Sequence, residues 1–199
     1  MKQLVLTLAL AAGLTLPVAA QSMGSVNANA PKVTTAIEFA DGAKLTVTYK
    51  ALNFGQGSWL ERAKSERARN MYNQNAKENP CGSVSVSKDM VVAGTQIAAG
   101  EYGLHFMFGD DGTPMAMLST TDKEGNAQMQ QFPLKLEAME SHSQRLAISI
   151  SAGEKDGTCV IALQFGKLGM KCTGTTAAAG GEKGDGKGAD QGKEKVSDK

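Results

Sequence analysis

Residues 98–112 read AAGEYGLHFMFGDDG and carry the clearest strand pattern in the chain. The large apolar side chains of this stretch occupy alternate positions: Tyr102, Leu104, Phe106 and Phe108. Because successive side chains of a strand point to opposite faces, we expect these four to form one buried face. Gly100 precedes the strand, and the turn residues at 110–112 end it. His105 falls on the opposite face, where we expect an exposed or partly packed imidazole.

Other short segments alternate in the same way. Residues 32–39 and 44–49 flank Asp41-Gly42, a pair that tolerates the positive φ of a tight hairpin turn. Further candidate strands lie at 83–87, 90–92, 101–108, 115–119, 132–136, 145–150, 159–165 and 168–172. Short strands at roughly ten-residue spacing are typical of antiparallel sandwiches and barrels. We therefore predict an all-β domain over residues 32–174: an antiparallel β-sandwich, or partly open barrel, of about 8–9 strands with one inserted helix.

The inserted helix is predicted near residues 59–76. Ser58 and Glu61 have the spacing of a capping box, and the residues that follow are rich in helix formers. Asn79-Pro80 provides the expected stop. The apolar stripe of this segment is thin, which favours a helix that lies on the sandwich rather than inside it.

The two ends of the chain differ in composition from the middle. Residues 1–20 contain Lys2, an apolar run over 4–16 and then a cleavage region with small residues, Pro17-Val18-Ala19-Ala20. This pattern predicts a secretory signal peptide with cleavage near Ala20, and hence a periplasmic or extracellular protein that is soluble after cleavage. Residues 21–31 are interpreted as a linker. Residues 175–199 are rich in Gly, Lys and acids, and are predicted to be a disordered tail.

Charge argues against several partners. Removal of residues 1–20 takes away Lys2, which leaves 20 basic and 20 acidic side chains. A neutral chain has no field that would attract a polyanion, so we expect no nucleic-acid partner. The apolar run at 4–16 is shorter than the roughly 20 residues that a transmembrane helix needs, and no later stretch is longer. We therefore expect no transmembrane segment.

From the first hairpin to Cys172 the chain resembles the DUF2911 family of exported bacterial proteins. The segments that carry this resemblance are LTVTY (45–49), SVSVSKD (83–89), IAAGEYGL (97–104) and ALQFGKL (162–168). The resemblance implies a small β-sandwich-like domain and no particular activity. The family's Trp-Arg-Thr-Gly-Ala-Asn block, which precedes the strand matching SVSVSKD, is replaced here by residues 75–82. No site residue therefore follows from the resemblance.

Three cysteines in an exported protein raise the question of a disulfide: Cys81, Cys159 and Cys172. If 165–166 is a two-residue loop, Cys159 faces Cys172 across a hairpin. A loop at 166–167 keeps both cysteines on one face but places Cys172 opposite Ile161. A one-residue shift puts the cysteines on opposite faces, where they cannot bond. A Cys159–Cys172 bridge and three packed thiols both remain open.

The sequence offers few marks of catalysis or cofactor binding. His105 and His142 stand at no metal-ligand spacing, there is no CxxC, and the acidic turn at 122–126 lacks the Gly and Glu of a calcium loop. Neither a nucleophile elbow nor a phosphate-binding or dinucleotide glycine loop is present. We therefore expect no metal and no cofactor, and we assign no catalytic residue.

Two functional interpretations remain. The first is a non-catalytic binding or interaction module of the cell envelope, with an envelope ligand or protein as its partner. Its ligand would lie in a groove or at the sheet edge near the helix, where we expect Trp59, Tyr72 and His105 to gather. The second is a small periplasmic enzyme with dispersed catalytic residues.

Overall fold

The structure is a computed structural model that describes residues 29–53, 58–122 and 124–177. The predicted signal peptide, most of the linker and the tail from residue 178 lie outside the described residues. The elements follow in the order β1 (Lys32–Glu38), β2 (Lys44–Lys50), α1 (Ser58–Ala63), α2 (Glu66–Glu78), β3 (Gly82–Val86), β4 (Met90–Val92), β5 (Thr95–Ile97), β6 (Gly100–Phe108), β7 (Pro114–Thr121), β8 (Ala127–Pro133), β9 (Glu137–Ala152) and β10 (Thr158–Thr176).

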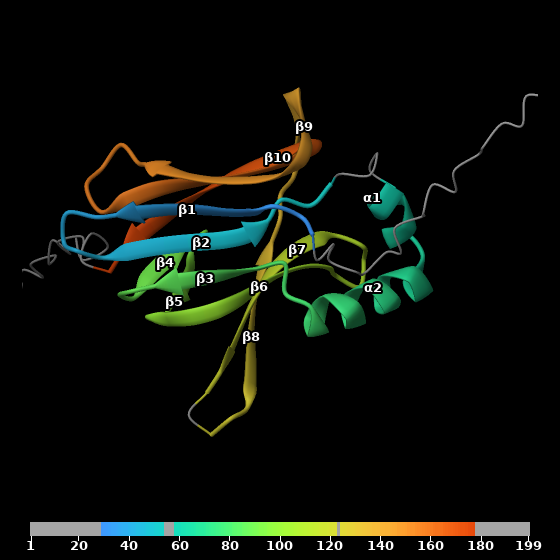
Figure 1. Ribbon diagram of the computed structural model, residues 1–199, viewed down its shortest axis with the longest axis horizontal. Coiled ribbons are helices and arrows are strands. Elements are labelled where there is room, and N and C mark those ends of the chain that lie inside the picture. Colours follow the sequence, from blue (N-terminus) through green and yellow to red (C-terminus); the bar gives the residue numbers. More distant parts are fainter. Residues whose placement is uncertain (1–28, 54–57, 123, 178–199) are drawn as a thin grey trace, which may run out of the picture.

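These strands form two antiparallel sheets that pack face to face (Figure 1). The large sheet has the order β1-β2-β3-β6-β7-β8, and the small sheet has the order β5-β4-β10-β9. One core joins them, with Leu45 and Val84 from the large sheet against Met90, Ile148 and Cys159 from the small one. The predicted fold class is confirmed: the described chain is an all-β sandwich of two open sheets with a helical insertion.

β1 and β2 form the predicted hairpin around Asp41-Gly42. Ile37 pairs with Leu45 and Thr35 with Val47, and the turn contains Gly42 at a φ of 77°. Positive φ is strained for residues with a side chain, so Asp41-Gly42 determines this turn. β8 differs from the predicted strand at 132–136, because it begins at Ala127. The residues at its start do not alternate between apolar and polar, yet they pair with β7.

Strand β6 is buried on both faces. Leu104 and Phe108 are buried, with Tyr102 and Phe106 partly buried against the sandwich core, as the alternation predicts. On the opposite face Met107 is also buried, and His105 is only 3% exposed. The expectation of an exposed or partly packed His105 was therefore wrong. The reason is that α2 packs on this face of β6 (Figure 1), which alternation along one strand does not indicate.

The helical insertion is divided into α1 and α2 rather than continuous. Ser65 has an extended backbone (φ −90°, ψ 122°) and accepts a hydrogen bond from the N–H of Arg69 through its carbonyl, so it is the N-cap of α2. The Arg69 guanidinium donates to the carbonyl of Ala63 at 3.0 Å, which satisfies an acceptor at the end of α1. Helix α2 ends at Glu78 with Asn79 as its C-cap, so it stops before Pro80, where the sequence predicts the stop.

Within β10 the chain reverses direction. The N–H of Thr176 donates to the carbonyl of Gly157 at 2.9 Å, and Gly174 lies against the Cys159 side chain, so the two halves of β10 run side by side. Gly166 has a φ of 66°, which fits the first central residue of a two-residue hairpin turn with Lys167. Of the registers considered above, this is the one that has its loop at 166–167.

One side of the sandwich is closed by hydrogen bonds between β9 and the large sheet. The N–H groups of three alternate β9 residues find acceptors outside their own sheet, two in strands of the large sheet and one in the segment that follows β2. Leu146 donates to the carbonyl of Leu52, and Ile150 donates to the hydroxyl of Thr35. The Tyr49 hydroxyl accepts from the N–H of Ile148 at 2.9 Å and donates to its carbonyl at 3.3 Å. β9 is thus an edge strand whose outer N–H groups at 146, 148 and 150 are satisfied by residues outside its own sheet.

Replacing Tyr49 by Phe removes the hydroxyl and leaves both backbone groups of Ile148 without their partner in the core. We expect a loss of roughly 2 kcal/mol in the free energy of unfolding, measured by urea denaturation. Tyr102→Phe is the matched control, because its hydroxyl donates to the carbonyl of Ala98 in an exposed position. The control should cost less than about 0.5 kcal/mol. Equal losses in the two variants would contradict the role given to Tyr49.

Candidate functional site

His105 lies between α2 and the large sheet, and both of its ring nitrogens are engaged. Nδ1 is 2.7 Å from the carbonyl oxygen of Ala76, on α2. Nε2 is 2.7 Å from Oγ of Ser119, on the neighbouring strand β7. His105 pairs with Met117 across β6 and β7, so Ser119 is its diagonal neighbour on the same face.

These contacts determine the tautomer of the neutral imidazole. A carbonyl oxygen only accepts hydrogen bonds, so Nδ1 carries the hydrogen and donates it to Ala76. Nε2 is then an acceptor, and the Ser119 hydroxyl donates to it. The result is a serine hydroxyl aimed at an imidazole base whose other nitrogen is held by a third group. This is the arrangement in which a serine is activated as a nucleophile.

Gly103 lies directly against this pair, and the space over its Cα is filled by Ser119, His105 and Pro80. It is the cross-strand partner of Ser119, and both residues are on the outer face of the large sheet. A Cβ at Gly103 would lie 2.6 Å from Ser119 Oγ and 3.1 Å from His105 Nε2, which is closer than side chains pack. The missing side chain therefore makes room for the Ser119–His105 contact, and Ser119 remains half-buried rather than covered.

Beyond α2 the same face of the large sheet carries many hydroxyl groups. The registers of the strands align one row across five strands: Thr34, Thr48, Ser83, Gly103 and Ser119. A second row contains Ala36, Thr46, Ser85 and Glu101. The side chains of both rows are exposed or half-buried, and the hydroxyls of Thr34 and Thr48 are 2.9 Å apart. We call these two rows the hydroxyl face.

The predicted grouping of Trp59, Tyr72 and His105 falls at this place only in part. Tyr72 and His105 both lie in the layer between α2 and the large sheet. The Tyr72 ring is 5.1 Å from that of Phe108, and burial, with a smaller contribution from Cys81, raises the pKa of its phenol to about 12. Trp59 belongs to α1, but its side chain lies outside the described residues. The two described members pack under the helix instead of lining an open groove.

Two side chains complete the backbone hydrogen bonds of β6 where it extends past the end of β3. The carbonyl of Leu104 accepts from the backbone N–H of Cys81 at 2.8 Å, and the Cys81 thiol adds a second bond at 3.2 Å. The Asn73 amide donates to the carbonyl of Phe108 at 2.7 Å and accepts from its N–H at 2.9 Å. Asn73 therefore takes the place that a neighbouring strand would occupy, and it fixes α2 to the end of β6.

The three cysteines are free thiols in the structure. Gly174 is adjacent to Cys159 in the β10 hairpin, so Cys172 is a diagonal neighbour of Cys159 on the same face. Burial raises the pKa of both thiols, and Cys172 adds to the increase at Cys159. The Cys159–Cys172 disulfide stays a prediction.

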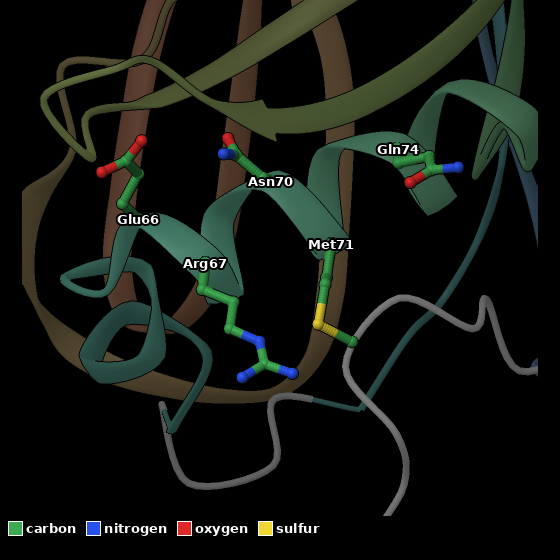
Figure 2. Close-up of a pocket in the computed structure, with 5 residues that line it drawn as sticks. All are labelled: Glu66, Arg67, Asn70, Met71 and Gln74. Carbon is green, nitrogen blue, oxygen red and sulfur yellow. The ribbon is translucent and has the colours of Figure 1, made fainter.

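Figure 2 shows a shallow depression along the solvent side of α2, lined by Glu66, Arg67, Asn70, Met71 and Gln74. All five residues belong to one helix, so this is a helix flank and not an enclosed site. Met71 is 61% exposed there. Among the residues that the structure describes, no group of His, Cys, Asp and Glu is arranged to hold a metal ion. No helix in that part of the chain is long and apolar enough to cross a membrane.

Comparison of the chain with protein-family models, with curated proteins and with solved structures found no match. The DUF2911 resemblance therefore stays a prediction, and the site rests on its own geometry. Sequence reasoning had identified His105 but had missed Ser119, Gly103 and Asn73. The one signal for Ser119 was its position at the end of a predicted strand, which does not indicate its partner.

Replacing Asn73 by Ala should remove both of its hydrogen bonds to the backbone of Phe108, in a partly buried position. We expect the free energy of unfolding to fall by about 2 kcal/mol, measured by chemical denaturation. Asn70→Ala removes the same side chain from an exposed position of the same helix and should change stability by less than about 0.5 kcal/mol. A similar small effect for Asn73→Ala would refute its structural role.

Stability should fall at alkaline pH because of Cys81. Burial raises the pKa of its thiol from 9.0 to about 12, against smaller opposing effects of backbone N–H groups and Lys50. The unfolded chain therefore releases this proton first, so the contribution is intact below pH 9.0 and is lost as the pH rises toward 12. Between pH 8 and 10.5 we expect Cys81 to account for a loss of about 2 kcal/mol.

Urea denaturation at the two pH values, for wild type and Cys81→Ala, measures this contribution as the difference in pH dependence. Cys172→Ala is the control, because that thiol is only half-buried. The pH dependence should flatten clearly in Cys81→Ala and much less in Cys172→Ala. Parallel pH profiles for wild type and Cys81→Ala would show that the Cys81 thiol is not shielded.

Proposed function

We propose that the chain is an exported protein of the cell envelope and that its β-sandwich is a binding module. The proposed ligand is a neutral polysaccharide chain that lies on the hydroxyl face beside α2. The observation that carries this proposal is the row across the large sheet in which β1, β2, β3 and β7 each contribute a Thr or Ser hydroxyl and β6 contributes Gly103. Export is supported by the signal-peptide pattern of residues 1–20 and by the DUF2911 resemblance.

The chemistry of this face favours a sugar over a charged or an apolar ligand. Each Thr or Ser hydroxyl is both a donor and an acceptor, and so is each sugar hydroxyl, so the two surfaces pair in many registers. Charged side chains are sparse in the two rows, with Glu101 as the exception. The side chains are short and come from one sheet face, so they present a flat surface suited to an extended chain.

Binding can be tested with protein purified from the exported fraction, whose intact mass also gives its N-terminus. Titration calorimetry with N-acetylglucosamine and glucose oligomers should show binding by wild type. Thr48→Val and Ser85→Ala each remove a hydroxyl from the face and should weaken binding several-fold. Ser149→Ala removes an exposed hydroxyl from β9 in the other sheet and should leave binding unchanged. Absence of binding by wild type, or equal weakening by Ser149→Ala, would overturn the proposal.

A second candidate, a small envelope enzyme, is favoured by one observation. The Ser119 hydroxyl and the His105 imidazole form a hydrogen-bonded pair at the border of the hydroxyl face. A binding module does not need this pair. The reactivity of Ser119 and His105 can therefore be tested independently of ligand binding.

A further inference from the structure

We infer that Ser119 is a nucleophile, that His105 is its general base, and that this pair transfers small acyl groups from esters to water. The observations behind this are the two hydrogen bonds of His105 and the half-buried position of Ser119 at the border of α2. The inference does not depend on polysaccharide binding and goes beyond it.

The imidazole is held in the orientation that a general base needs. His105 is buried and bonded through both nitrogens, so rotation of the ring would break two hydrogen bonds at once. The Ala76 carbonyl fixes the hydrogen on Nδ1 and is placed to stabilise the imidazolium that forms when Nε2 takes up a proton. It has the role that a carboxylate has in the Ser-His-Asp arrangement, but without the full negative charge.

The Ser119 hydroxyl can be approached from the outer face of the sheet. Ser119 is half-buried, and its cross-strand neighbour Gly103 has no side chain to cover it. The space over Gly103 is filled by the two members of the pair and by Pro80, so an ester has to reach Ser119 from the side away from Gly103.

The reaction balances with water as the only co-reactant. Ser119 Oγ attacks the ester carbonyl carbon, and its proton moves to Nε2 of His105. The bond from carbon to the alcohol oxygen breaks, and the leaving alcohol takes the proton from Nε2. A water molecule then attacks the acyl-serine and gives a proton to Nε2. The bond to Oγ breaks, the acid leaves, and Ser119 recovers its proton.

A fluorophosphonate probe tests the nucleophile directly, because it forms a covalent bond with activated serines. Intact mass and peptide mapping of the full chain should show one adduct, on Ser119. Ser119→Ala should abolish the adduct, and Ser149→Ala should leave its rate unchanged. If the hydroxyl only satisfies a buried imidazole, wild type will not react. No adduct on wild type, or an adduct elsewhere that persists in Ser119→Ala, would overturn the inference.

Hydrolysis of p-nitrophenyl acetate tests the base and the access to the site. We expect Ser119→Ala and His105→Gln to lower the rate above buffer roughly 100-fold or more. Gly103→Ala should also lower it, because the added Cβ meets both members of the pair. Circular dichroism and thermal melting check that each variant folds.

If His105→Gln fails to fold, Ser119→Cys replaces it. Its thiol should react with iodoacetamide clearly faster than the same thiol at the exposed position of Ser149→Cys. Equal alkylation rates for the two cysteines would refute the role of His105, as would a hydrolysis rate that Ser119→Ala leaves unchanged.

Discussion

The sandwich depends on how the outer edge of β9 is satisfied. The Tyr49 hydroxyl reaches from the large sheet and bonds with both backbone groups of Ile148, next to similar bonds from Thr35 and Leu52. An unpaired edge at this position would leave buried polar groups without partners and would invite pairing with another chain. These bonds hold the two sheets together on this side, where Leu45 and Val84 pack against the small sheet. The opposite face of the large sheet packs against α2.

Local features of the sequence were enough for the fold class and for most strands. The alternation at 102–108 and the Asp41-Gly42 turn each involve residues that are neighbours in the chain. Features of this kind can be predicted from a single sequence. The sequence left several registers open for the β10 hairpin. The structure has the one in which Gly166 is the first residue of the two-residue loop, where its positive φ is needed. The break between α1 and α2 was not predicted, because helix formers continue through it.

The candidate site shows where sequence reasoning stops. His105 was singled out, but its burial comes from a helix that packs across the strand, and its bond to Ser119 comes from the register of β6 with β7. Neither relation is visible in the spacing of the two residues along the chain. α2 covers one part of the sheet face and leaves the hydroxyl rows open, so the imidazole is shielded from water while the serine lies at the boundary. That boundary is where a polar ligand and a buried base can meet.

The Asn73 amide has a consequence for the dynamics of the molecule. Because it replaces a strand as the partner of Phe108, α2 cannot move away from the sheet without exposing broken backbone bonds at the end of β6. The helix and the β6–β7 hairpin should therefore open together, as one cooperative unit in hydrogen exchange, with amides in α2 as slow as those of the hairpin. Motion near the Ser119–His105 pair then requires this whole unit to open, so the pair stays assembled for as long as the domain is folded.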